Sequence, residues 1–149
     1  MDHEKYMREA LELAREAACS GEVPVGCVVV DESGGIIGRG RNRREEIPDA
    51  SAHAEVEAIR EACAARGTWN LSGCALVVTL EPCPMCAGAV INSRVSTVVY
   101  GAKERLTGSC GSVINLFEEN YGHRPAVYGG VLAFECQALL TEFFRTMRK

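Results

Sequence analysis

The segment CALVVTLEPCPMCAGA, residues 74–89, contains the pattern that decides the fold. Its first part, residues 74–80, is apolar and rich in β-branched side chains, which is typical of a strand buried on both faces. Pro84 suits the first turn of a helix, where a missing N–H costs no hydrogen bond. A strand that passes directly into a helix, with Cys83 and Cys86 at the junction, indicates an α/β fold.

The sequence on both sides of this segment continues the alternation of strands and helices. Residues 25–30 and 36–42 predict two strands, and the turn Ser33-Gly34-Gly35 between them predicts an antiparallel hairpin. Residues 52–66 have the pattern of a helix that Gly67 ends. The remaining predicted elements are helices at 3–18, 84–93, 112–119 and 132–147 and strands at 97–100 and 127–128.

Two of the predicted helices are amphipathic. The first has apolar residues at helical spacing, namely Met7, Ala10, Leu11, Ala14 and Ala17. The last has the apolar positions Leu132, Leu139, Leu140, Phe143 and Phe144. Each is expected to cover the sheet with its apolar side.

Together these elements predict one domain over residues 1–149, because no repeat, low-complexity segment or linker divides the chain. The expected fold class is α/β, a three-layer α/β/α sandwich around one mixed five-stranded sheet. A helix between the last two strands would make these strands parallel through a right-handed crossover.

The composition favours a cytoplasmic protein. The chain has 149 residues, of which 47% are hydrophobic, enough for one core. No apolar run approaches the roughly 20 residues of a membrane span, and residues 1–5 lack the start of a signal peptide. In a reducing compartment the eight cysteines are expected to be core residues or metal ligands. We assign to the core Cys27, Cys63, Cys74 and Cys136.

Cys83 and Cys86 are spaced to bind one metal ion. Residues i and i+3 lie on one side of a helix, and the positive end of the helix favours thiolates. His53 is the expected third ligand, because His3 is near the N-terminus and His123 is in a late loop. Three protein ligands leave one position of a zinc ion open, as in catalytic sites. We therefore expect one Zn²⁺ per chain and no organic cofactor.

Glu55 is the expected catalytic residue. It follows His53 by two positions, at the start of the same predicted helix. A carboxylate there can take a proton from the water that zinc activates. It can then pass protons to a ring nitrogen and to a departing amine, which predicts hydrolytic deamination.

The ordered combination of His53-Ala54-Glu55 and Pro82-Cys83-Pro84-Met85-Cys86 is the signature of zinc-dependent nucleobase deaminases. With these blocks, Gly40-Arg41-Asn42-Arg43 and residues 79–89, the chain resembles the cytidine and deoxycytidylate deaminase superfamily. Within it, the chain is most similar to bacterial tRNA adenosine deaminases. This resemblance implies a cytidine deaminase-like fold, conversion of adenosine to inosine at the first anticodon position of tRNA, and a homodimer.

The same resemblance suggests the substrate contacts. It implies that Asn42 contacts the nucleoside and that the loop 101–112 and the last helix hold the anticodon loop. The candidate substrate-binding residues are Asn42, Lys103, Glu104, Arg105, Arg124 and Phe144. Basic residues at 39–44, with Lys103, Arg105 and Arg124, would contact phosphates.

Some features leave alternatives open. Glu104 and Leu106 stand where the family usually has Asp and Lys, and the net charge of the chain is −4. One alternative is a deaminase of a free nucleobase or nucleoside, of the guanine or cytosine type, whose pocket the C-terminal segment would close. Another is a non-catalytic interaction module in which Cys110 or Cys74 completes a structural zinc site. Glu55 would have no use in such a module.

The predicted helix after Pro84 also bears on the homodimer. Its apolar residues outnumber what one short helix needs for its own core, so a second chain is expected to share them. These residues are Met85, Ala87, Ala89, Val90 and Ile91.

Overall fold

The computed structural model describes residues 1–147 and contains a five-stranded sheet of order β2-β1-β3-β4-β5. Its strands are β1 (Gly26–Val30), β2 (Ile36–Arg41), β3 (Ala75–Leu80), β4 (Thr97–Ala102) and β5 (Ala126–Tyr128). Strand β1 is antiparallel to both β2 and β3, whereas β4 is parallel to both β3 and β5. The predicted mixed sheet, the hairpin and the parallel last pair are therefore confirmed.

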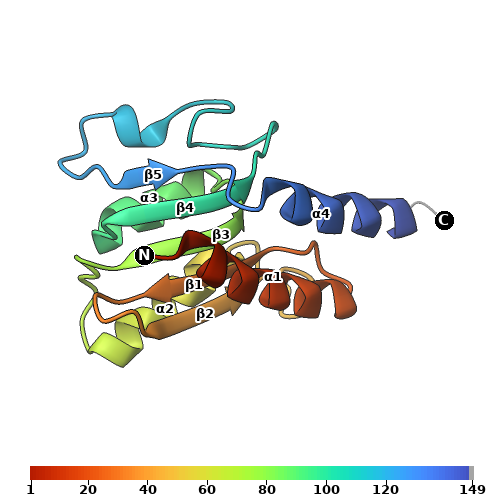
Figure 1. Cartoon of the computed structure of the whole chain (residues 1–149), viewed down its shortest axis with the longest axis horizontal. Coiled ribbons are helices and arrows are strands. Elements are labelled where there is room, and N and C mark those ends of the chain that lie inside the picture. The colour runs from red at the N-terminus through yellow and green to blue at the C-terminus, as the bar shows by residue number, and fades with distance from the viewer. Residues whose placement is uncertain (148–149) are drawn as a thin grey trace.

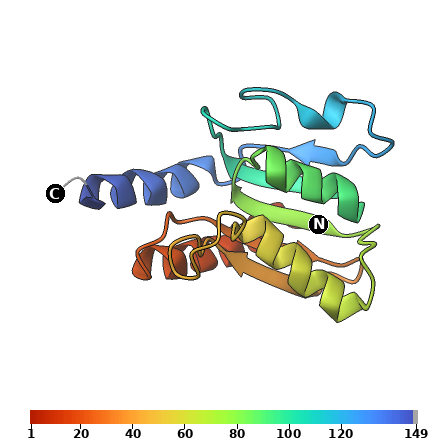
Figure 2. The ribbon, with the colours of Figure 1, turned by 180° about the vertical axis from the view of Figure 1, so that it is seen from behind.

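Helices cover both faces of this sheet. They are α1 (His3–Cys19), α2 (Ala54–Arg66), α3 (Pro84–Ser93) and α4 (Ala133–Met147). Helices α1 and α4 lie on the face seen in Figure 1, and α2 and α3 lie on the opposite face, seen in Figure 2. The three-layer α/β/α sandwich is therefore confirmed.

The strands pack on both sides because successive side chains point to opposite faces. In β1, Val28 belongs to the core under α1, whereas Val29 belongs to the core under α2 and α3. In β3, Val77 likewise belongs to the core under α1, and Val78 belongs to the core under α2 and α3. This double burial explains why the central strands are nearly continuous apolar runs. All five apolar positions predicted for the first helix are buried.

Close packing of α2 on β2 brings the start of α2 to one end of the sheet. A Cβ atom at Gly40 would lie 2.1 Å from the carbonyl oxygen of Ala54, and one at Gly38 would lie 2.2 Å from that of Ala58. Only glycine permits this approach of helix backbone to strand. Helix α2 begins at Ala54 with His53 as its N-cap, two residues later than predicted.

The segment before β5 differs from the prediction. A helix was expected over 112–119, but the structure has only the 3₁₀ helix η1 (Leu116–Glu118). Residues 103–115 instead form a loop whose polar groups bond to the loop and to the sheet end. β4 and β5 are nevertheless parallel, because the segment between them brings the chain back to the end of the sheet where β4 begins. A long helix is not required for this return.

The last helix also differs from the prediction. Of α4, only Cys136 and Leu140 are buried, while Leu139 and Phe143 are half-buried and Phe144 is 45% exposed. The helix packs against the sheet with its first half and then extends beyond the sheet (Figure 1). Its predicted apolar side therefore covers the core only in part, because the sheet ends before the helix does.

The cysteines largely occupy their predicted places. Cys27, Cys74 and Cys136 are buried, whereas Cys63 is only partly buried and packs against the edge of the core under α2 and α3. Its thiol lies at the helix surface, where it donates to the carbonyl oxygen of Trp69 at 3.7 Å. Within residues 1–147, the structure contains no helix with the length and apolarity to cross a membrane.

Candidate metal centre and active site

The candidate site lies at one end of the sheet, where four strands begin or end together. Strands β3 and β4 end there because they are parallel, and Leu80 and Glu104 lie at or just beyond their ends. Strand β1 begins there because it is antiparallel to β3, and β2 therefore ends there, next to Asn42. Side chains far apart in sequence thus meet around one pocket.

His53 and Cys83 line this pocket, and the buried Cys86 lies against His53. Nδ1 of His53 lies 3.7 Å from Sγ of Cys83 and 3.5 Å from Sγ of Cys86. His53 is the N-cap of α2, and Cys83 is the N-cap of α3, with Pro84 following it in the first turn. The two helix starts therefore hold the three donor atoms, which all lie within 4.8 Å of one another.

This donor set fits a zinc ion. Tetrahedral zinc, with bonds of about 2.0–2.1 Å to nitrogen and about 2.3 Å to sulfur, places such donors about 3.5 Å apart. The nitrogen–sulfur distances of 3.5 and 3.7 Å match this separation. Among the residues that the structure describes, no fourth His, Cys, Asp or Glu joins the cluster. Cys74, at the start of β3, is at the opposite end of the sheet.

The electrostatic surroundings favour metal binding by the two sulfurs. A hydrogen bond with Cys86, together with His53, lowers the pKa of the Cys83 thiol to about 4. The same hydrogen bond and burial raise the pKa of Cys86. Two thiols in contact compete for ionisation, and a divalent cation stabilises both of them as thiolates.

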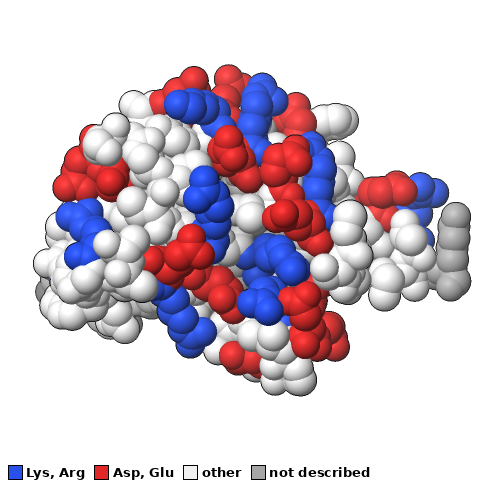
Figure 3. Space-filling view, turned by 90° about the horizontal axis from the view of Figure 1, so that it is seen from below, with Lys and Arg blue, Asp and Glu red and all other residues white. Residues whose placement is uncertain are grey.

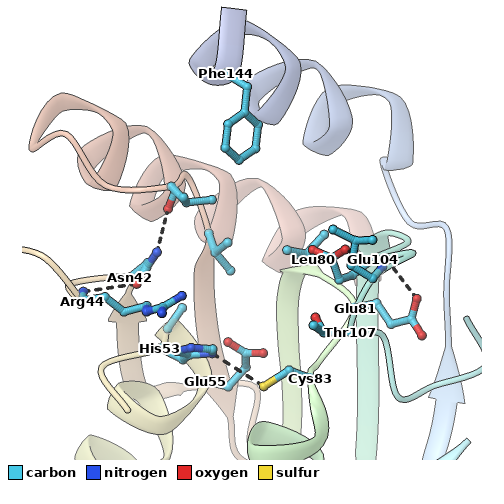
Figure 4. A pocket seen from close by; sticks show the side chains of 14 residues that line it. Asn42, Arg44, His53, Glu55, Leu80, Glu81, Cys83, Glu104, Thr107 and Phe144 are labelled. Atoms are coloured by element: carbon cyan, nitrogen blue, oxygen red, sulfur yellow. Dashed lines mark hydrogen bonds between the residues drawn. The ribbon is translucent and has the colours of Figure 1, made fainter. Parts of the chain in front are cut away.

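Glu55 lies buried beside the donor atoms and is only 4% exposed. It belongs to the first turn of α2 and lines the same pocket as His53 and Cys83 (Figure 4). Burial raises the pKa of Glu55 to about 7. A carboxyl group with such a pKa can both accept and release a proton near neutral pH.

The pocket itself has a cavity of about 270 Å³. Figure 4 shows Asn42 and Arg44 on one side, Glu104 and Thr107 on the other, and Phe144 of α4 at the mouth. Further lining residues are Val23, Val25, Ala54, Leu80, Glu81 and Leu106.

Asn42 is held in place at the pocket wall. It is 7% exposed, and its Nδ2 donates to the carbonyl oxygen of Val23 at 3.4 Å. Its Oδ1 accepts from the backbone N–H of Arg44 at 3.3 Å. The side chain is therefore oriented before any ligand enters.

The structure does not bring all predicted substrate residues to the pocket. Asn42, Glu104 and Phe144 line it, while Lys103 and Arg105 are exposed on the adjoining loop. Arg124 lies just before β5, and β5 begins level with the start of β4. Arg124 is therefore at the other end of the sheet, where it donates to the carbonyl oxygen of Glu118.

Sequence reasoning missed several pocket residues, above all Glu81 and Thr107. Glu81 is an acid directly between a buried strand and Pro82, an unusual place for a charge. That position was a usable signal. Thr107 carries no local signal, because only the folded loop brings it to the pocket.

The basic run at 39–44 forms no uninterrupted basic surface. Arg41 and Arg43 both pair with Glu46, at 3.3 and 2.5 Å, and only Arg44 of this run reaches the pocket. Figure 3 shows acidic and basic side chains interspersed over the face that it presents. Arg41 and Arg43 therefore already have an acidic partner within the chain.

The apolar residues of α3 are less available to a second chain than predicted. Ala87, Val90 and Ile91 are buried in the core of their own chain, because α3 packs on the sheet and on η1. Ala89 is partly buried against the same core. Only Met85 is exposed, at 39%.

Comparison with known proteins adds to this geometry. A family model described as the zinc-binding region of cytidine and deoxycytidylate deaminases matches residues 1–102. These residues include His53, Glu55, Cys83 and Cys86.

The chain is also similar to individual proteins. A tRNA-specific adenosine deaminase of Bacillus subtilis is 51% identical over 98% of this chain and 91% of that protein. A tRNA(Ile)-lysidine synthase of Deinococcus radiodurans is 51% identical over 96% of this chain, which spans only 25% of that protein. A solved structure from a study of A-to-I editing by tRNA:A34 deaminases at the wobble position has a TM-score of 0.87 and 41% identity. That similarity covers 91% of this chain and 99% of the other.

Proposed function

Because the chain belongs to the cytidine and deoxycytidylate deaminase family, we propose that it converts adenosine to inosine at the wobble position of a tRNA anticodon. The observation that carries the proposal is one small pocket that joins the His53, Cys83 and Cys86 donors to the buried carboxyl of Glu55. The enzyme acts as one domain over residues 1–149, with one zinc ion per chain, in the cytoplasm.

When bound, zinc supplies Lewis-acid activation of a water molecule near neutral pH. Nδ1 of His53 and the sulfurs of Cys83 and Cys86 would hold the ion, as three protein ligands do in catalytic zinc sites. Glu55 takes a proton from the attacking water and delivers it to the purine ring nitrogen beside the reacting carbon. A C–O bond forms at this carbon, its C–N bond breaks, and the amine leaves as ammonia with the second proton.

The walls of the pocket orient the nucleoside. Asn42 and Glu104 offer polar atoms to the base and ribose, and Phe144 offers a ring on which a neighbouring base can stack. Lys103 and Arg105 contact phosphates from the exposed part of the loop. Arg124 takes no part in this assignment because of its place at the other end of the sheet.

The shape of the site favours a base within RNA over a free base. A cavity of about 270 Å³ suits one nucleobase. Helix α4 extends away from the sheet and places Phe144 at the mouth, so the rest of a nucleic acid strand can stay outside (Figures 1 and 4). An unstacked base of a single-stranded loop can be splayed into such a pocket.

The substrate can be tested with an anticodon stem-loop that carries adenosine at its first anticodon position. We expect inosine to form on this RNA with a kcat/KM at least about a hundredfold above that for free adenosine, because truncation removes remote contacts that help the reaction. The measurement is chromatographic separation of inosine after nuclease digestion.

Matched substrates make this test decisive. A stem-loop with adenosine one position downstream is the control and should remain unchanged. Free guanine and cytosine are assayed in parallel. Rapid turnover of either free base, with no inosine on the stem-loop, would replace the tRNA assignment by the small-molecule one.

We also propose a homodimer, supported by exposed apolar residues near the site. Val113 is 55% and Ile114 is 47% exposed, in the segment that leads to η1, which packs against α3.

Sedimentation at micromolar concentration should give twice the mass of one chain. Ile114→Glu should give monomers, because it would bury a charge in the interface. Trp69→Glu, at an exposed site beyond α2, is the control and should remain dimeric. A monomeric unmodified protein would refute the proposal.

A further inference from the structure

Two loops form opposite sides of the pocket. One is the turn 42–47 after β2, which carries Asn42 and Arg44 to the pocket. The other is the substrate loop, residues 103–112, which contributes Glu104, Leu106 and Thr107. Neither loop contains a helix or strand, so something other than regular secondary structure must hold each in place.

A buried carboxylate holds the substrate loop. Glu81 is 2% exposed, and its Oε1 accepts from the backbone N–H of Glu104 at 3.1 Å. Its Oε2 accepts from the backbone N–H groups of Cys110 at 2.9 Å and of Ser112 at 3.1 Å. The hydroxyl of Ser112 also donates to Oε1. One carboxylate therefore joins both ends of the loop to the end of β3.

The charge of Glu81 is stabilised by these N–H and O–H donors. Within residues 1–147, no Lys, Arg or His side chain forms an ion pair with it. A buried charge is costly unless hydrogen bonds satisfy it, so the loop conformation and the charge depend on each other.

Gly108 closes the loop over the same carboxylate. Its backbone N–H donates to the carbonyl oxygen of Glu104 at 2.8 Å. A Cβ atom at this position would lie 2.5 Å from the carboxyl carbon of Glu81 and 2.3 Å from the carbonyl oxygen of Glu104. The loop thus packs on Glu81 with no room for any larger residue.

A second buried carboxylate holds the opposite side. Glu22 is 1% exposed, and its Oε2 accepts from the backbone N–H groups of Glu45 at 3.1 Å and Glu46 at 2.6 Å. These amides directly follow Arg44 in the turn after β2. Both sides of the pocket are therefore built in the same way, from a buried acid and loop amides.

We propose that Glu81 and Glu22 are positioning residues, which hold the substrate loop and the turn 42–47 in the shape that accepts the target nucleotide. The inference rests on the proposed function, since it assigns these loops to RNA binding. Neither acid touches the reacting atoms in this role. Glu81 acts through Glu104 and its neighbours, and Glu22 acts through Arg44 and Asn42.

Glu81→Gln tests this role. Glutamine has nearly the same size, but its Nε2 is a donor and would face N–H donors where a carboxylate oxygen now accepts. In the zinc-loaded full chain, we expect amide exchange at Cys110 and Ser112 to accelerate about tenfold or more, measured by NMR, since bonds to a charged acceptor are lost. Exchange at Glu45 and Glu46 should be unchanged. Glu22→Gln should give the reverse pattern.

The kinetic expectation separates positioning from a structural or metal role. For the anticodon stem-loop, Glu81→Gln should raise KM about tenfold, with kcat within about threefold of the unmodified protein, because a disordered loop weakens binding more than the chemical step. Zinc content should stay at the level of the unmodified protein. Glu81→Asp keeps the charge on a side chain that is shorter by one methylene group. Its KM should therefore lie between that of Glu81→Gln and that of the unmodified protein.

Matched variants complete the test. Glu9→Gln removes an exposed charge on α1 and should change neither exchange nor kinetics. If Glu81→Gln does not fold, Gly108→Ala disturbs the same contact from the loop side and should reproduce its effects. Faster exchange with unchanged KM, unchanged exchange, or loss of zinc would each overturn the proposal. If the unmodified protein forms no inosine on the stem-loop, the proposed function is refuted instead. The exchange data would then still show whether Glu81 and Glu22 hold their loops in place.

Discussion

Cys83→Ala is expected to abolish zinc binding and deamination together. Cys83 and Cys86 supply both sulfur donors, and His53 supplies the only nitrogen donor of the cluster. With one sulfur removed, two donors remain, which is fewer than the three protein ligands usual for catalytic zinc. Metal analysis by mass spectrometry should find one zinc per chain in the unmodified protein and almost none in the variant.

The same substitution should lower stability. A zinc ion held by His53, Cys83 and Cys86 would join the starts of α2 and α3, and an ion that binds only the folded chain stabilises it. At free zinc about 1,000 times above its Kd this is worth about 4 kcal/mol, which corresponds to a melting temperature lower by roughly 8–16 °C in the variant. Calorimetry of both proteins, each with and without a chelator, measures this difference. The chelator should lower the melting temperature of the unmodified protein only.

Two cysteine controls accompany this experiment. Cys19→Ala changes an exposed cysteine at the end of α1 and should keep zinc, stability and activity. Cys110→Ala tests the idea of a fourth ligand. Burial raises the pKa of this thiol to about 12, and it lies outside the donor cluster, so the variant should keep its zinc. Zinc retained by Cys83→Ala, or lost from Cys110→Ala, would contradict the proposed ligand set.

Glu55→Gln should keep zinc and abolish most turnover. Glutamine preserves the volume of this buried side chain but cannot carry a proton from water to the base. Loss of general acid–base catalysis should reduce kcat by about 10²–10⁴-fold. KM for the stem-loop should change little, because the residues assigned to RNA contacts remain. Single-turnover kinetics on the stem-loop, over a range of enzyme concentrations, measure the rate of the chemical step and the affinity for the RNA. Metal analysis measures the zinc content.

Glu57→Gln is the matched control for this variant. Glu57 belongs to the same first turn of α2, so its neutralisation disturbs the helix start equally, but it does not line the pocket. Its activity should stay near that of the unmodified protein. Near-normal turnover by Glu55→Gln would mean that Glu55 has no part in proton transfer, and the proposed mechanism would be wrong.

The sequence alone predicted the elements that depend on local patterns. The apolar run at 74–80 is the central strand β3, with five of its six residues buried. The motif residues His53 and Cys83 occupy helix starts, as expected from the chemistry of Pro84 and the helical pattern that follows each of them. Such features are determined by residues within a few positions of one another, which is why sequence reasoning finds them.

Only the tertiary structure decided which residues surround the pocket. Strand direction brings Glu81 to the site and places Arg124 at the opposite end of the sheet, and the fold of the loop after β4 brings Thr107 to the pocket. The pairing of Arg41 and Arg43 with Glu46 likewise depends on how the turn after β2 folds back. Strand order and loop shape come from long-range packing and from buried groups such as the Glu81 carboxylate. No spacing along the chain records these interactions, because their partners are distant in sequence.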